Sequence, residues 1–249
     1  MTTVFKRRLI LAATLLFVIG LIAKLPARVA FAFAPDTVQT RGITGTLWNG
    51  RVQAVDVQGV RAGPINWTLK PLSLFTGALA ASVECGLPNG FFDGDITVRA
   101  SSIRIDDAKV SVSLADVTRN FSIGPSTGEV SGRIDTLLLK NQWPTRADAA
   151  LNLRALSYPA VGPDALGSYR LVFDSALADE RWPVVGELTS VDGPYAVDGT
   201  LSLGDGRAYS MQADVTPTAE ATQRLKDALR LLGPAAADGS HALVFDGNL

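Results

Sequence analysis

Tyr195-Ala-Val-Asp-Gly-Thr-Leu-Ser-Leu203, the turn Gly204-Asp-Gly206 and Tyr209-Ser-Met-Gln-Ala-Asp-Val215 decide the fold of this chain. In both runs, apolar and polar residues alternate. This period of two is typical of a β-strand that buries one face and exposes the other to solvent. A short, glycine-rich turn between two such runs favours antiparallel neighbours. The stretch is therefore predicted to form a β-hairpin.

The same period of two recurs along the chain from Val38 onward, interrupted by turn signals such as Asn49-Gly50 and Pro88-Asn89-Gly90. Glycine stands inside several of these runs, which weakens a strand but permits strong curvature. The predicted fold class is all-β: a long, twisted, curved antiparallel sheet, with one N-terminal transmembrane helix and one C-terminal amphipathic helix. The alternating runs lie at residues 44–48, 52–57, 65–69, 95–100, 110–114, 128–134, 147–153 and 169–173.

The C-terminal amphipathic helix is predicted after Thr216-Pro217, because threonine can cap a helix and proline suits its first position. Leu225 and Leu229 belong to one apolar stripe at helical spacing, and Gly233-Pro234 ends the pattern. We expect this helix to pack on the sheet or to plug one end of it. A last short strand, residues 241–245, is predicted to close the chain.

An uncharged segment near the N-terminus predicts the transmembrane helix. The cations Lys6, Arg7 and Arg8 precede residues 9–23, which carry no charge. If Lys24 snorkels, the segment reaches Leu25 and spans about 17 residues, the lower limit for a ~30 Å hydrocarbon core. Cationic flanks stay in the cytoplasm, so the rest of the chain is expected to be exported. The predicted organisation is a cytoplasmic tail (1–8), a transmembrane anchor (9–25), a linker (26–37) and a periplasmic β-rich domain (38–249).

A cleaved signal peptide is the competing interpretation of this segment. Ala30-Phe31-Ala32 and Ala32-Phe33-Ala34 both have the small-x-small pattern of a cleavage site. The apolar stretch is longer than a usual signal core, and Lys24 and Arg28 intervene before the candidate sites. Pro35 should also hinder cleavage at the second site. Both interpretations place the domain outside the cytoplasm.

Composition and motifs give little support to an enzyme. The formal net charge of −1 shows no large block of either sign, so a nucleic-acid partner is not expected. His241 and Cys85 are the single histidine and cysteine, which excludes a His/Cys metal cluster and an intramolecular disulfide. An envelope hydrolase would require acids that converge around His241 or near Asp93 and Asp95. We expect no catalytic residues, no metal and no cofactor.

Aromatic residues and one apolar loop are the remaining candidates for structural or partner contacts. Trp48 and Trp67 lie close to turn residues, as do the other two tryptophans, and are expected to pack at strand ends. Leu69 to Gly77 is apolar and contains Pro71 and Phe75, so it is expected to be a loop rather than a central strand. The loop could contact a membrane or a partner, but folding over the core is the favoured interpretation.

These features together resemble a known family. Four parts of the chain are similar to the type II secretion system protein N family, often called GspN. They are Gly45-Thr-Leu-Trp48-Asn-Gly50, Ile65-Asn-Trp67-Thr-Leu69-Lys-Pro71, the helix at 225–233 and the ending Phe245-Asp-Gly-Asn-Leu249. The resemblance covers essentially the full chain. The first two elements also resemble the wider AsmA-like group of envelope proteins, while the C-terminal helix favours the secretion protein.

The resemblance implies a function without catalysis. The chain would be an accessory or scaffold subunit in the inner membrane, supporting export of folded periplasmic proteins across the outer membrane. Its partners would be the inner membrane and other inner-membrane subunits of that machine. The alternative is an AsmA-like protein that binds or transfers envelope lipid through an apolar groove.

Overall fold

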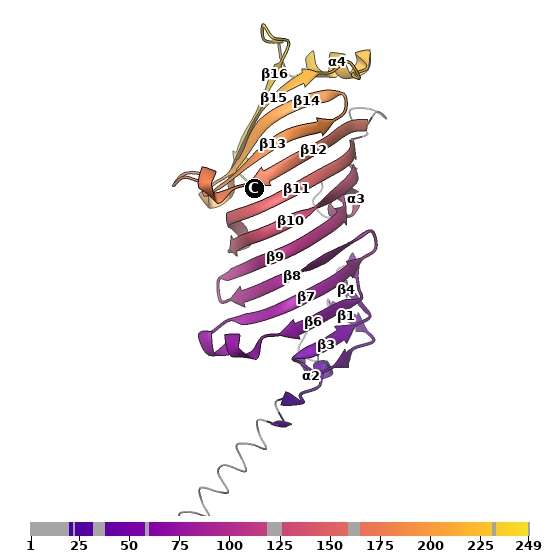
Figure 1. The fold of residues 1–249 in the computed structure, drawn as a ribbon, viewed down its shortest axis with the longest axis vertical. Helices are drawn as coiled ribbons and strands as arrows, with labels where there is room; N and C mark the ends of the chain where they lie inside the picture. The colour runs from indigo at the N-terminus through magenta and orange to yellow at the C-terminus, as the bar shows by residue number, and fades with distance from the viewer. Residues whose placement is uncertain are drawn as a thin grey trace, which may run out of the picture. The chain divides into compact units, whose positions relative to one another are not determined.

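The computed structural model describes residues 20–248, apart from positions 22, 32–37, 58–59, 119–125, 159–164 and 231–232. The chain divides into two compact units, Met1–Pro88 and Asn89–Leu249, and β-strands dominate both (Figure 1).

The first unit contains two sets of antiparallel strands. A small sheet has the order β1-β4-β5, and four further strands pair in the order β2-β3-β6-β7. A 3₁₀ helix, η1 (Pro71–Thr76), connects β6 to β7, and a short helix, α2 (Ala27–Phe31), precedes the strands. The strands are β1 (Val38–Arg41), β2 (Thr44–Gly45), β3 (Asn49–Val52), β4 (Ala54–Val57), β5 (Val60–Ala62), β6 (Ile65–Leu69) and β7 (Leu79–Leu87).

The second unit is an antiparallel meander in which each strand from β8 to β16 pairs with the next strand in the sequence (Figure 1). The predicted hairpin at 195–215 is present as β14 and β15, with Tyr195 opposite Pro217 and Leu203 opposite Tyr209. Short helices α3 (Leu114–Thr118), η2 (Ser175–Leu177) and η3 (Asp205–Arg207) lie between strands. The strands are β8 (Gly90–Arg99), β9 (Ser102–Ser113), β10 (Thr127–Lys140), β11 (Trp143–Ser157), β12 (Ala165–Phe173), β13 (Val184–Asp192), β14 (Tyr195–Leu203), β15 (Ala208–Pro217) and β16 (His241–Asn248).

The C-terminal helix, α4 (Gln223–Arg230), begins later than the sequence predicts. Thr216 and Pro217 do not start it, because they continue β15 and lie opposite Ala196 and Tyr195 of β14. Thr218 then holds the chain against the β13–β14 turn: its amide donates to the Pro194 carbonyl and its hydroxyl to the Gly193 carbonyl. Thr216 and Pro217, which by local preference would begin a helix, are therefore part of a paired strand instead.

The N-terminal part requires a correction to the predicted fold class. The structure contains no helix, within its described residues, with the length and apolar character needed to cross a membrane.

The predicted transmembrane helix is therefore wrong for the described residues, although the antiparallel strands are present as predicted. Among the described residues, strand-like pairing begins at the end of the predicted anchor: the Leu25 carbonyl accepts from the Leu47 amide, and Pro26 forms an antiparallel bridge with Thr46. This strand-like pairing stops a helix there. Lys6, Arg7, Arg8 and most of the predicted anchor lie outside the described residues.

Candidate functional site

The second unit has one apolar sheet face, built from rows of residues that lie directly opposite one another on successive strands. Directly opposed residues share a face, as do residues two apart on one strand. Two such rows cross the eight strands β9 to β16 without a charged residue. The first row is Ala108, Ile134, Ala149, Phe173, Gly186, Leu201, Met211 and Phe245; the second is Val110, Gly132, Leu151, Leu171, Leu188, Gly199, Ala213 and Leu243.

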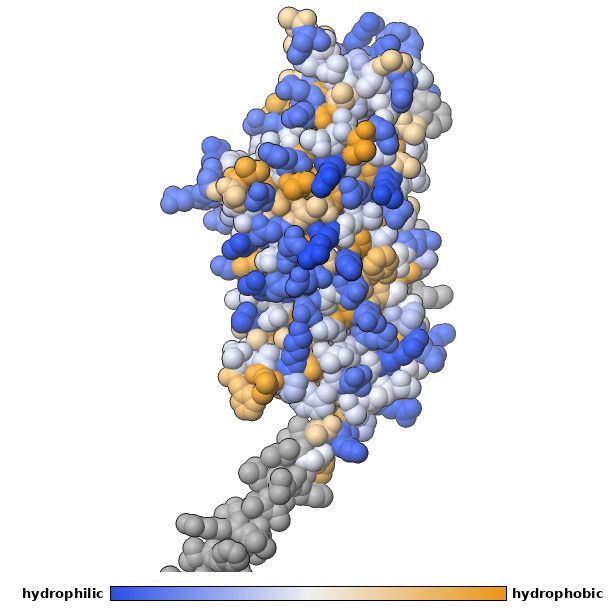
Figure 2. Space-filling model, viewed as in Figure 1, coloured by the Kyte–Doolittle hydropathy of each residue, from blue (hydrophilic) through white to orange (hydrophobic). Residues whose placement is uncertain are grey.

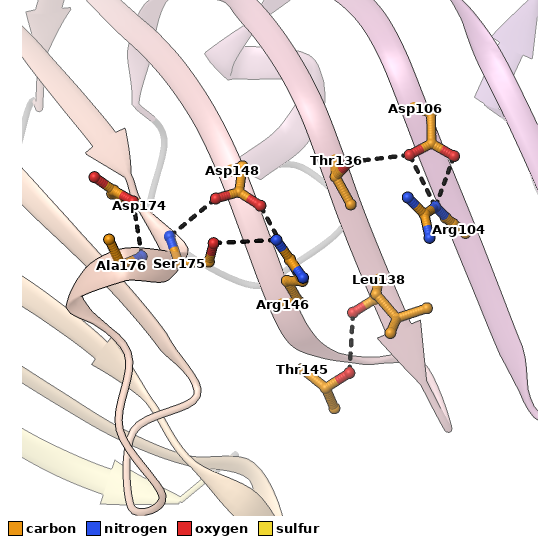
Figure 3. Close-up of polar contacts among 10 residues, drawn as sticks. All are labelled: Arg104, Asp106, Thr136, Leu138, Thr145, Arg146, Asp148, Asp174, Ser175 and Ala176. Carbon is orange, nitrogen blue, oxygen red and sulfur yellow. Dashed lines mark hydrogen bonds and ion pairs between the residues drawn. The ribbon is translucent and has the colours of Figure 1, made fainter.

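The opposite face of the same strands is polar. A row next to the second apolar row, one residue away along each strand, contains Ser111, Ser131, Asn152, Arg170, Thr189, Asp198 and Asp214. Polar side chains also bond across strands: Thr136 donates to Asp106, which pairs with Arg104 at 2.8 Å (Figure 3). The sheet is therefore amphipathic, with opposite chemistry on its two faces.

Helix α4 covers one corner of the apolar face. Leu225 is 1% exposed and Leu229 5% exposed, and both pack with Tyr195 and Val215 of β14 and β15. The Tyr195 hydroxyl donates to the Leu225 carbonyl at 3.0 Å, which fixes the helix against the sheet. The structure thus brings Leu225 and Leu229, two of the predicted contact residues, into a buried cluster with the sheet.

An open apolar groove of about 180 Å³ lies on the same face, over β10 to β14. Small side chains, Ala147 and Ala149, are buried in it, while Phe173 and Leu203 are larger and only partly buried. The complete lining is Ile134, Leu137, Leu139, Pro144, Ala147, Ala149, Leu151, Phe173, Val184 and Leu203. We call this the apolar groove, and its lining suits contact with aliphatic or aromatic groups.

A second, more polar hollow of about 680 Å³ lies at the ends of β11, β12 and β13, where residues preceding α4 also line it. Burial raises the pKa of Tyr169 in this hollow to about 12, with smaller contributions from Tyr195 and Asp192. The Tyr169 hydroxyl donates to the Leu166 carbonyl at 2.6 Å. This hydrogen bond holds the Tyr169 side chain against its own strand, β12.

Trp48 and Trp67 belong to one compact hairpin unit in the first half of the chain. Gly45 adopts a positive φ of 86°, and the Thr46 amide donates to the Asn49 carbonyl, which closes the turn between β2 and β3. The Trp67 indole N–H donates to the Leu47 carbonyl at 2.9 Å. Trp48 lies in the turn, where its carbonyl accepts from the Leu69 amide at 2.7 Å. The paired tryptophan motifs therefore build a tight β2–β3–β6 junction.

Pro71 and Phe75 lie in η1, which is not folded over a core. Phe75 is 89% exposed and Leu72 78% exposed, so the expectation that this loop covers the core is wrong. Figure 2 shows a hydrophobic patch at the lower left, where η1 lies in Figure 1.

The chemistry-bearing residues considered in the sequence do not converge. His241 is buried, and its Nδ1 lies 3.0 Å from the Gly233 carbonyl. Asp93 and Asp95 both lie in β8. Burial raises the pKa of the half-buried Cys85 thiol. Among the residues described, no three His, Cys, Asp or Glu side chains gather where they could hold a metal ion.

The sequence indicated an apolar groove only as part of the lipid-binding alternative and did not identify its residues, although it predicted most of the strands that form it. The groove depends on which residue of one strand lies opposite which residue of the next. Alternation marks two faces on each strand, but it does not align the faces of neighbouring strands. The sequence feature that could have indicated the groove is the small residues in runs such as Ala147 to Leu151, because small side chains suit the floor of a hollow.

Comparison with known proteins gives a consistent result. Residues 36–244 match the family model described as type II secretion system (T2SS), protein N. The chain is 25% identical over 264 positions to type II secretion system protein N of Aeromonas hydrophila, an alignment that covers 98% of this chain and all of that protein. It is 36% identical over 69 residues to the protein of the same name from Vibrio cholerae serotype O1, covering 27% of each. No solved structure matches the chain.

Proposed function

Because the chain belongs to the type II secretion system protein N family, as its sequence motifs predicted, we propose that it is a non-catalytic accessory subunit that works as a scaffold at the inner membrane. The chain is a type II secretion system component. The proposal adds that the β-rich part lies on the periplasmic side and holds other inner-membrane subunits, so that folded proteins are exported across the outer membrane. The likeness to AsmA-like proteins stays a prediction.

The observation that carries this proposal is the apolar face of the second unit. Ordered apolar rows that extend from β9 to β16 offer a partner a regular apolar surface, and α4 covers the corner around Tyr195 and Val215. Contiguous apolar surface on a folded protein usually marks an interaction site. A subunit of a multiprotein machine requires such a surface.

The ionisable residues support a structural role for the same unit. Hydrogen bonds from the Ser175 side chain and backbone lower the pKa of Asp148, with a further contribution from Arg146. Figure 3 shows the bond from the Ser175 amide and the ion pair with Arg146. Hydrogen bonds from Ser240 similarly lower the pKa of Asp238. In both cases the carboxylate holds a loop or a strand end, a structural role that supports the scaffold proposal.

Site-specific photo-crosslinking in living cells tests the scaffold proposal. A photoreactive phenylalanine analogue replaces Phe173 in the apolar groove, and the matched control replaces Thr200 on the polar face. We expect position 173 to capture another subunit of the secretion machine and position 200 not to. Capture of no subunit from position 173, with normal secretion by the variant Leu203→Asp, would contradict the proposal.

Lipid binding is a second candidate, favoured by one observation: the apolar groove is lined only by hydrophobic residues, including Ile134, Leu137 and Phe173. Acyl chains fit such a lining without any hydrogen-bonding partner. Organic extraction of the purified full chain, followed by mass spectrometry, tests it. Lipid that is recovered from the wild type but lost in Leu203→Asp would support this function, whereas no recovered lipid would eliminate it.

A further inference from the structure

An exposed apolar turn projects from the first unit at η1. Leu72, Leu74, Phe75 and Leu79 are 78%, 48%, 89% and 47% exposed, and they lie within eight residues of one another. Large apolar side chains exposed singly are normal on proteins, but a contiguous group of this kind calls for a partner. We call these four residues the η1 patch.

The polar groups of this turn bond within the turn. The Ser73 hydroxyl donates to the Lys70 carbonyl at 2.7 Å and accepts from the Ala80 amide at 3.1 Å. The Thr76 hydroxyl donates to the Ser73 carbonyl at 2.7 Å. The Gly77 amide donates to Leu74 and the Ala78 amide to Ser73. Because these groups already have partners, the turn can leave water for an apolar medium without the large cost of unsatisfied polar groups.

The size and charge of the patch distinguish a bilayer from a protein partner. Four such side chains expose on the order of 500 Å², less than the ~800 Å² that each partner contributes to a standard protein interface. From Leu69 to Val83 the sequence contains no acidic residue, and its single charge is Lys70. A cation beside exposed apolar side chains is favourable at the surface of a membrane that contains anionic lipid.

We propose that the η1 patch inserts into the surface of a lipid bilayer, with Leu72, Leu74 and Phe75 among the acyl chains and Lys70 at the level of the headgroups. The contact aligns the first unit on the membrane, while the apolar face of the second unit remains the surface for other partners. This inference rests on the proposed site of action at the inner membrane, but it concerns lipid alone and no other subunit.

Depth-dependent fluorescence quenching tests the insertion on the full chain. In a Cys85→Ser background, Phe75→Cys is labelled with NBD, and the protein is reconstituted into phosphatidylethanolamine–phosphatidylglycerol vesicles. Some of the lipids carry a doxyl quencher on the acyl chain. The matched control carries the label at Val244→Cys, an exposed apolar position (60%) in β16 of the second unit. Circular dichroism verifies that each labelled protein is folded.

The expected result is a blue shift and the loss of most NBD emission at position 75 when doxyl lipid is present, with unchanged emission at position 244. Adding Leu72→Ser and Leu74→Ser to the protein labelled at position 75 should restore much of the emission. Equal quenching at the two positions, or a blue shift at 75 without doxyl quenching, would overturn the proposal. These outcomes are independent of crosslinking from position 173, so failure of the two proposals can be told apart.

Discussion

Asp148 shows how one side chain couples the stability of the second unit to pH. Its carboxylate accepts from the Ser175 amide at 2.9 Å and pairs with Arg146 Nε at 3.1 Å (Figure 3). These contacts lower its pKa in the folded protein. A lowered pKa adds stability at pH values above the ordinary aspartate value of ~3.9, and this contribution is lost as the pH falls through the lowered value.

We therefore expect Asp148→Asn to lower the urea midpoint at pH 7 and pH 5. The difference from the wild type should shrink as the pH falls through the lowered pKa of Asp148, because the wild-type carboxylate then becomes protonated too. Circular dichroism of the detergent-solubilised chain at each pH measures the midpoints. Asp135→Asn is the control, because both Asp135 and its partner Arg133 are largely exposed and such pairs add little. A difference that persists unchanged into acid would refute the role of the charge.

At the scale of the element, strands were predictable where local pattern and pairing agree. Ile65–Leu69 forms β6 as predicted, and the runs at 195–203 and 209–215 lie in β14 and β15. The start of α4 was not predictable, because Thr216 and Pro217 have a local preference for a helix start that pairing with β14 overrides. The residues that line the apolar groove were not predictable either, since register depends on contacts between distant residues.

The β2–β3–β6 junction carries a prediction of its own. Gly50 lies opposite Trp67, and a Cβ atom placed at Gly50 would come within 2.2 Å of the Trp67 ring. We expect Gly50→Ala to destabilise the first unit by roughly 1–3 kcal/mol, because the crowded ring must move. Hydrogen exchange of the amides in β3 and β6, which reports local opening, measures the loss.

A double-mutant cycle supplies the control for this junction. In a Trp67→Ala background the ring is absent, so Gly50→Ala should cost almost nothing. The backbone at Gly50 does not have the positive φ found at Gly45, and alanine is therefore sterically acceptable there once the ring is removed. Equal costs of Gly50→Ala in the two backgrounds would show that the contact with Trp67 is not responsible.

At the scale of the whole molecule, the connectivity of the second unit controls how a local change spreads. Each strand from β8 to β15 pairs with the strand that follows it in the sequence. The buried cluster of four residues in the second unit joins α4 to β14 and β15. Structures assembled from such neighbour contacts resemble repeat proteins, whose stability is close to a sum of local contributions. Damage at one strand should therefore weaken nearby strands more than distant ones.

Val184→Ala tests this expectation in the middle of the sheet. Val184 is 1% exposed in β13, so losing two methyl groups should cost roughly 1–3 kcal/mol. We expect hydrogen exchange to accelerate in β12 to β14, which flank or contain the site, and to stay unchanged in β8 and β9. Thr189→Ala, at an exposed position of the same strand, is the matched control and should change neither region. If exchange in β8 rises as much as in β13, the unit unfolds as one cooperative block, and its apolar rows stabilise one another over the full sheet rather than strand by strand.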